Sequence, residues 1–118
     1  KIEIINVNGN NIAVLKDKGI LIREVQDALD IMAEASYQHA NKIIITDDQI
    51  IPAFFDLKTG IAGEILQKFS VYNVWLAVIG DFSKYSGKNL RNFIFESNRY
   101  GRINFVSSLE EAKEKLGR

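Results

Sequence analysis

The chain has 118 residues, of which 47% are hydrophobic and 25% are charged, a composition typical of one globular domain. Its 15 basic residues balance 15 acidic ones, so no overall field favours binding to nucleic acid or to an anionic membrane surface. Cysteine is absent, which excludes disulfides, thiol catalysis and cysteine-bound metals. No apolar run approaches the roughly 20 residues of a membrane span. We expect a single cytoplasmic domain over residues 1–118.

The amino-terminal part of the chain predicts a β-hairpin followed by a helix. Residues 2–7 and 12–15 are rich in β-branched and aliphatic side chains, and the segment between them begins with Asn8-Gly9, a pair that tolerates positive φ. An antiparallel hairpin is therefore expected. Between residues 23 and 35, apolar side chains recur at i, i+3, i+4 and i+7, which indicates a helix with one buried face.

Three short apolar runs predict strands that are buried on both faces. They cover residues 42–46, 74–79 and 103–106. Helical patterns separate and follow these runs, at residues 59–69, at residues 89–98 and from Leu109 onward, and Pro52 is suited to begin an additional helical turn. Ser108 and Glu111 have the spacing of a capping box at the start of the last helix.

The predicted order of elements is β-β-α-β-α-β-α-β-α. Strands that alternate with helices after a hairpin indicate an α/β domain with right-handed crossovers. The sheet is expected to be mixed but mostly parallel, with the amino-terminal hairpin supplying the antiparallel edge. The two glycines of the second helix, Gly60 and Gly63, suggest that this helix approaches a neighbouring element closely.

The segment Lys58-Thr59-Gly60-Ile61-Ala62-Gly63 opens the second helix directly after a strand and a turn. In this position it resembles the motif Asp-Ser-(Ser/Thr)-Gly-Leu-Gly of the STAS domains of sulphate transporters and anti-sigma-factor antagonists. The resemblance implies that Thr59 stands at the hydroxyl that a partner kinase phosphorylates in some members. The chain departs from the motif because Leu57 replaces the acid, with Asp56 one residue early, and Lys58 replaces the first serine.

Longer phrases of the sequence give a second resemblance. The second half of the chain, from Leu76–Asp81 to Ser108–Ala112, is similar to the SpoIIAA-like branch of the same folds. Over nearly its full length the chain resembles a bacterial family catalogued as domain of unknown function 4180. The phrases Val25–Asp30, Phe55–Gly60 and Asn104–Glu110 carry this match, which implies a fold but no activity.

Thr59 supports two interpretations. If it begins the helix, the free amides of the first turn point at its side chain, and a phosphate there would gain hydrogen bonds and helix-dipole stabilisation. The alternative is an ordinary N-cap threonine, which is a common residue at helix starts.

Acidic residues follow two of the predicted parallel strands, where open α/β sheets bind ligands. Asp47, Asp48 and Asp81 could hold a metal or act as acid and base, or they could be ordinary turn and cap residues. The only histidine, His39, lies at a polar helix end. With no second histidine and no cysteine it lacks partners for a zinc site, and its position argues against a Ser-His-Asp triad.

Two further groups of side chains could form surfaces. A basic group around the third helix suggests either an anion-binding surface or a solvated face, and it comprises Lys84, Lys88, Arg91, Arg99 and Arg102. An aromatic group is expected around the same strand ends, as part of the core and its rim, and it comprises Phe54, Phe55, Trp75, Phe82 and Tyr85.

From these patterns we expect a non-enzymatic regulatory or interaction module that binds a protein partner or a small ligand near the Asp56–Gly63 loop. The expected binding residues are Asp56, Lys58, Thr59, Gly60, Asp81 and Ser83, with Thr59 as the phosphorylation site. No catalytic residue, metal ligand or cofactor is expected. The alternatives are a small metal-dependent enzyme that uses the strand-end aspartates, and a homo-oligomeric scaffold such as a homodimer.

Overall fold

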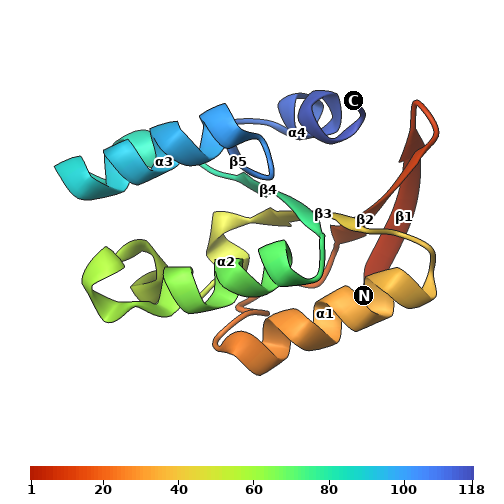
Figure 1. Ribbon diagram of the computed structural model, residues 1–118, viewed down its shortest axis with the longest axis horizontal. Helices are drawn as coiled ribbons and strands as arrows, with labels where there is room; N and C mark the ends of the chain where they lie inside the picture. Colours follow the sequence, from red (N-terminus) through yellow and green to blue (C-terminus); the bar gives the residue numbers. More distant parts are fainter.

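A computed structural model describes residues 1–118 as a single α/β domain, as the sequence predicts (Figure 1). The five strands are β1 (Ile2–Val7), β2 (Asn10–Leu15), β3 (Lys42–Thr46), β4 (Trp75–Ile79) and β5 (Ile103–Val106). The α-helices are α1 (Val25–Tyr37), α2 (Ile61–Val71), α3 (Lys88–Tyr100) and α4 (Leu109–Leu116). Short 3-10 helices form the turns η1 (Asp47–Gln49), η2 (Pro52–Phe55), η3 (Leu57–Thr59) and η4 (Phe82–Lys84). None of the helices has the length and apolar character needed to cross a membrane.

The strands form one mixed sheet in the order β1-β2-β3-β4-β5. β1 pairs antiparallel with β2, and β2 to β5 are parallel, which confirms the predicted antiparallel edge. The hairpin turn has only two residues, because Asn8 and Gly9 both adopt positive φ (54° and 87°) and Val7 already pairs with Asn10. β2 therefore begins two residues earlier than predicted.

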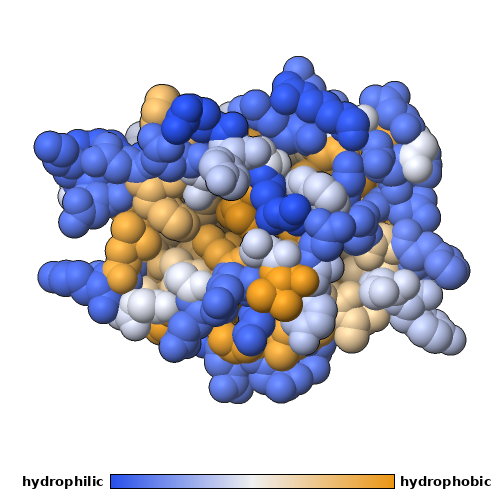
Figure 2. Space-filling view, in the orientation of Figure 1, coloured by the Kyte–Doolittle hydropathy of each residue, from blue (hydrophilic) through white to orange (hydrophobic).

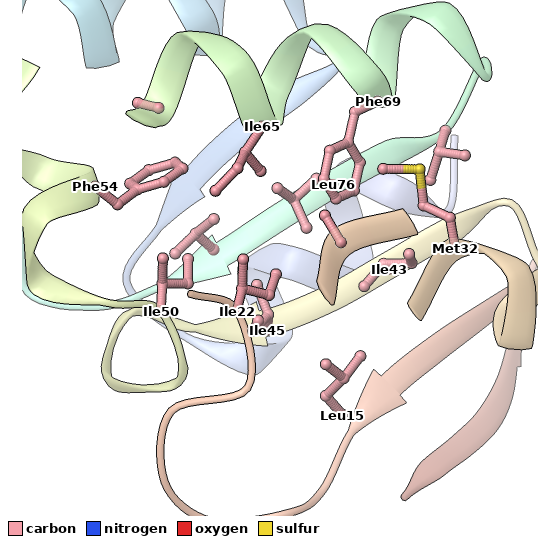
Figure 3. Close-up of a cluster of buried hydrophobic side chains, with 14 of the residues drawn as sticks. Leu15, Ile22, Met32, Ile43, Ile45, Ile50, Phe54, Ile65, Phe69 and Leu76 are labelled. Carbon is pink, nitrogen blue, oxygen red and sulfur yellow. The ribbon is translucent and has the colours of Figure 1, made fainter. Parts of the chain in front are cut away.

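The consecutive strand order determines where the helices lie. Each crossover moves in the same direction along the sheet, so right-handed connections place α1, α2 and α3 on one face. The main core lies on that face, where Met32, Ile65 and Phe69 from the helices meet the sheet (Figure 3). α4 covers the opposite face, where Ala112 and Leu116 form a cluster with one buried residue from each of β2 to β5.

The start of α2 differs from the prediction. Gly60 adopts a left-handed conformation (φ 77°) that ends η3, so the helix begins at Ile61 and not at Thr59. The expected close approach at Gly60 and Gly63 is wrong, since both residues are exposed and an added Cβ on either would meet nothing within 4 Å. The helix buries Ala62, Ile65 and Phe69. Gly63 lies two residues before Ile65, roughly 200° around the helix, and so faces solvent.

The last helix begins as predicted, with a modified cap. The amide of Glu111 donates to Ser108 Oγ at 3.1 Å, which makes Ser108 the N-cap. The carboxylate of Glu111 reaches back one residue further than in a standard capping box, because its Oε1 accepts from the amide of Ser107 at 3.0 Å.

Candidate functional site

The predicted site residues lie at the edge of the sheet where the parallel strands end, which we call the carboxyl edge. The segment Lys16–Gly19 follows β2, η1 follows β3, and η4 lies after β4. Because α2 runs back against the strand direction, its first turn and η3 lie at this edge as well. Open α/β sheets bind ligands at such an edge.

Thr59 is exposed at the start of α2, and its hydroxyl joins three segments. Its Oγ1 lies 2.9 Å from the carbonyl oxygen of Ala53 and 2.8 Å from that of Asp56, so its single proton is donated to the carbonyls of this turn. The same oxygen accepts from the amide of Ile61 at 3.2 Å. The N-cap position itself belongs to Gly60, so Thr59 lies one residue outside the position expected from the sequence.

Asp56 and Lys58 line a cleft together with the start of α3. Asp56 Oδ1 accepts from the amide of Lys58 at 3.3 Å, which caps η3. The cleft has a volume of about 340 Å³ and lies between residues 55–58 and 87–90; we call it the η3–α3 cleft. Figure 2 shows it at the left of the molecule as a hollow with apolar atoms inside and polar rims.

Asp81 and Ser83 form a separate polar pair on η4. Asp81 Oδ1 accepts from the amide of Ser83 at 3.1 Å and from its hydroxyl at 2.5 Å. The hydrogen bond from the Ser83 hydroxyl is the main reason why the pKa of Asp81 lies below its ordinary value. The predicted binding residues therefore divide into two groups, one on η3 and one on η4.

Aromatic rings connect these two groups. Phe55 stacks on Tyr85 with ring centroids 4.9 Å apart and lies 6.1 Å from Phe82. Phe55 is buried, whereas Phe82 and Tyr85 are partly buried against the core, so the core-and-rim interpretation of these rings is confirmed. Trp75 was wrongly placed with them. As the first residue of β4 it lies at the opposite edge of the sheet, in the cluster under α4.

An ion pair joins the ends of β3 and β4. Lys84 Nζ lies 2.9 Å from Asp47 Oδ2, and the Asp47 side chain is only 12% exposed. The hydrogen bond to Asp47 raises the pKa of Lys84. No other donor reaches this buried oxygen. Gly80 makes room for the carboxylate, because an added Cβ would lie 2.7 Å from Asp47 Cγ.

A hollow with a volume of about 740 Å³ also lies at the carboxyl edge, on the α4 side. Its walls include Asp47, Asp48 and the segment Lys16–Gly19. This segment was not among the predicted site residues, because the sequence pattern indicates β2 only as a hairpin strand, whereas its parallel pairing with β3 makes Lys16–Gly19 a strand-end loop. The buried Gln49 joins the two loops, donating to the Asp17 carbonyl at 2.8 Å.

The strand-end aspartates do not assemble into a metal-binding set. No group of three or more His, Cys, Asp or Glu side chains is arranged to hold an ion. Asp48 instead accepts from the Thr46 hydroxyl, and Asp47 pairs with Lys84. His39 is exposed just after α1, before β3 begins, and a five-residue strand of about 16 Å separates it from the carboxyl edge. A triad with Ser83 is therefore excluded.

The basic residues around α3 form two groups and not one surface. Lys84, Lys88 and Arg91 lie near the beginning of α3, whereas Arg99 and Arg102 lie at its end. A 13-residue helix separates these groups by about 20 Å. Arg91 donates to the Ser86 carbonyl at 2.7 Å, and Arg99 pairs with Glu96 at 3.0 Å.

Comparison with known proteins gives one match. A family model described as "Domain of unknown function (DUF4180)" matches residues 7–116. No curated protein and no solved structure matches the chain. The matched range includes all four α-helices and both turns that carry the predicted binding residues.

Proposed function

The chain belongs to the DUF4180 family, and we propose that it is a non-enzymatic regulatory module with STAS-like topology. In this proposal it binds a protein partner at the η3–α3 cleft and the adjacent Asp56–Gly63 loop, and phosphorylation of Thr59 weakens that binding. One observation carries the proposal. The exposed hydroxyl of Thr59 makes the hydrogen bonds that hold the turn forming one wall of the cleft.

The hydrogen bonds of Thr59 provide the switch. Phosphorylation removes the hydroxyl proton and adds about −1.5 to −2 charges. The modified side chain can no longer donate to the carbonyls of Ala53 and Asp56, and its charge repels both oxygens. The amide of Ile61 and the ammonium of Lys58 attract the phosphate instead. The η3 turn thus has two arrangements, and the charge on Thr59 selects between them.

The cleft fits a short segment of a partner protein. Phe55, Leu57 and Leu90 provide apolar surface, and Lys58 and Lys88 come from its two sides. A volume of about 340 Å³ accommodates a few side chains of a docked segment. We expect this segment to combine an apolar anchor with an acidic residue. A phosphate on Thr59 would compete with that acid for Lys58.

The hydroxyls at this edge support binding in preference to catalysis. Thr59 donates to backbone carbonyls, and Ser83 donates to Asp81, whose lowered pKa makes it a weak base. The single histidine lies at the other edge of the sheet. No side chain is therefore arranged to activate either hydroxyl as a nucleophile.

Comparison of charge variants tests the proposal. Proteins captured from the parent-cell lysate by wild type, and lost with Thr59→Glu, are purified and their affinities are measured by calorimetry. We expect Thr59→Glu to weaken binding at least tenfold and Thr59→Ser to retain it. Ser70→Glu is the matched control, because Ser70 is exposed near the other end of α2. Equal affinities for wild type, Thr59→Glu and Thr59→Ala, with equal thermal stability, would refute the switch.

The 740 Å³ hollow favours a second candidate function, the binding of a small ligand at the carboxyl edge. Val14, Ile44, Ile79 and Leu109 give it an apolar part, and Lys16 and Lys18 belong to its polar wall. Native mass spectrometry of protein purified from the parent cell distinguishes the two functions. A bound small molecule that is lost on Ile79→Trp, with Thr59→Glu unaffected, would favour this second function.

A further inference from the structure

A second polar site lies at the opposite edge of the sheet, where the parallel strands begin, and it surrounds the only tryptophan. Lys42 and Trp75, the first residues of β3 and β4, pair in register. The Lys42 ammonium lies 5.5 Å from the centre of the Trp75 ring, and the guanidinium carbon of Arg102 lies 4.4 Å from it. A hollow of about 330 Å³ opens beside these groups; we call it the Trp75 pocket.

The Trp75 pocket is lined by cations without any acidic side chain. Lys42, Arg99, Lys115 and Arg118 all belong to its wall, and Arg102 adds a fifth positive charge beside Trp75. Only Arg99 has a carboxylate partner, Glu96. Like charges gathered in this way repel one another, and the chain as a whole has no net charge. The concentration of positive charge is therefore local to this pocket.

Both cations beside Trp75 are partly withdrawn from water, and one of them has a nitrogen without an acceptor. Arg102 Nη1 is buried and donates to no acceptor in the protein, which costs free energy. Burial lowers the pKa of Lys42, whose ammonium donates to the Leu116 carbonyl at the end of α4 at 2.7 Å. An anion in the pocket would stabilise the charged form of Lys42, which belongs to the pocket wall.

The walls of the pocket are held in place by the amide side chains of one buried and one partly buried asparagine. Asn104 is 1% exposed and donates to the Gly101 carbonyl at 2.8 Å, which fixes the turn before Arg102. Asn98 pairs with both backbone polar groups of Phe105, at 2.7 Å and 3.1 Å, and so anchors α3 to β5. The cations are therefore presented from a rigid frame, and binding requires little ordering of the backbone.

We propose that the Trp75 pocket binds a small phosphorylated molecule, whose phosphate is held by the cations of the pocket wall. A volume of about 330 Å³ is at the lower end of ligand sites. Phosphate offers several acceptor oxygens, which suits a wall made of ammonium and guanidinium donors. Tyr100, 91% exposed at the rim, provides a face for an attached ring. A nucleic acid would instead require an extended basic surface, and the remaining basic residues of α3 lie elsewhere.

Trp75 makes the proposal directly testable, because it is the only tryptophan and its fluorescence reports on this pocket alone. The full chain is titrated with inorganic phosphate, pyrophosphate and adenosine monophosphate at constant ionic strength. We expect a saturable change in emission with at least one probe. Lys115→Gln, which removes one cation of the pocket wall, should weaken binding at least tenfold. Lys113→Gln, the same change on α4 outside the pocket, should alter the affinity less than twofold.

A second measurement covers the case in which emission does not respond. The amide and indole resonances of Trp75 and the amide of Gly101 are followed by NMR in the same titrations. Chemical shift changes that saturate at these residues support the site. Lys115→Gln must then raise the ligand concentration at which they saturate. The proposal is overturned if no probe shifts these resonances, if Lys115→Gln binds as wild type, or if only a single-stranded RNA binds, with steep salt dependence.

Discussion

Lys84 Nζ lies 2.9 Å from Asp47 Oδ2, and this ion pair joins the loop after β4 to the turn after β3. The pair depends on a third residue, because only a glycine at position 80 leaves room for the Asp47 carboxylate. The carboxyl edge is thus held by side chains that are 37 residues apart in the sequence. Its turns are positioned by packing as well as by local turn chemistry.

The contact between Gly80 and Asp47 predicts the effect of adding one methyl group. Gly80→Ala should displace the Asp47 carboxylate, break the ion pair and lower the free energy of unfolding by about 1–3 kcal/mol. Denaturant unfolding of a double-mutant cycle checks this. In an Asp47→Ala background the same Gly80→Ala change should cost much less, and an equal cost in both backgrounds would show that the two residues are independent.

The hydrogen bond from the Ser83 hydroxyl leads to a prediction for the pKa of Asp81. Because the bond from this hydroxyl lowers the pKa of Asp81, Ser83→Ala should move that pKa back toward its ordinary value of 3.8. A lowered pKa stabilises the folded chain above the unfolded value, and this stabilisation is lost as the pH falls through the folded value. NMR titration of the Asp81 carboxyl carbon between pH 2 and pH 6 measures the shift. Identical titration curves would contradict the assigned cause.

Replacing each of the two glycines at the start of α2 by alanine should change the stability of the protein in opposite directions. Gly63 is exposed inside the helix with free space around it, so Gly63→Ala should stabilise the protein by about 0.5–1 kcal/mol. Gly60 has a φ of 77°, so Gly60→Ala should destabilise it by about 1–2 kcal/mol. Thermal unfolding of both variants tests the pair. A loss of stability in Gly63→Ala would mean that this position is packed after all.

We expect two phenylalanines, one in the core under α1 to α3 and one outside it, to differ strongly in the stability lost when each is replaced by alanine. Phe69 is fully buried between α2 and the sheet, so Phe69→Ala should cost about 3–5 kcal/mol (Figure 3). Phe95 is 65% exposed on α3, and Phe95→Ala should change stability by less than about 0.5 kcal/mol. Urea unfolding at neutral pH measures both. Similar losses for the two variants would show that Phe95 is covered in solution.

Much of the fold could be predicted because it depends on local chemistry. The apolar runs at residues 42–46 and 103–106 coincide with β3 and β5, since a strand buried on both faces needs no alternation. Asn8-Gly9 accepts the positive φ that a two-residue hairpin turn requires, and Ser108 caps α4 with its own side chain. The environment of Gly63 was predicted wrongly, although its position opposite the apolar face of its helix indicates an exposed residue.

Contacts between distant segments could not be predicted in the same way. The last helix packs on the face opposite α1 to α3, where Ala112 and Leu116 meet residues of β2 to β5. The pairing of β3 with β4 places Lys42 beside Trp75, and the path of α4 brings Lys115 to the same pocket. Because these charged residues are far apart in the chain, no local sequence pattern indicates that they lie close together in the fold. The sequence by itself determined the elements and their order, whereas the ion pair of Asp47 and the Trp75 pocket were decided by tertiary packing, which alone sets the distances between side chains.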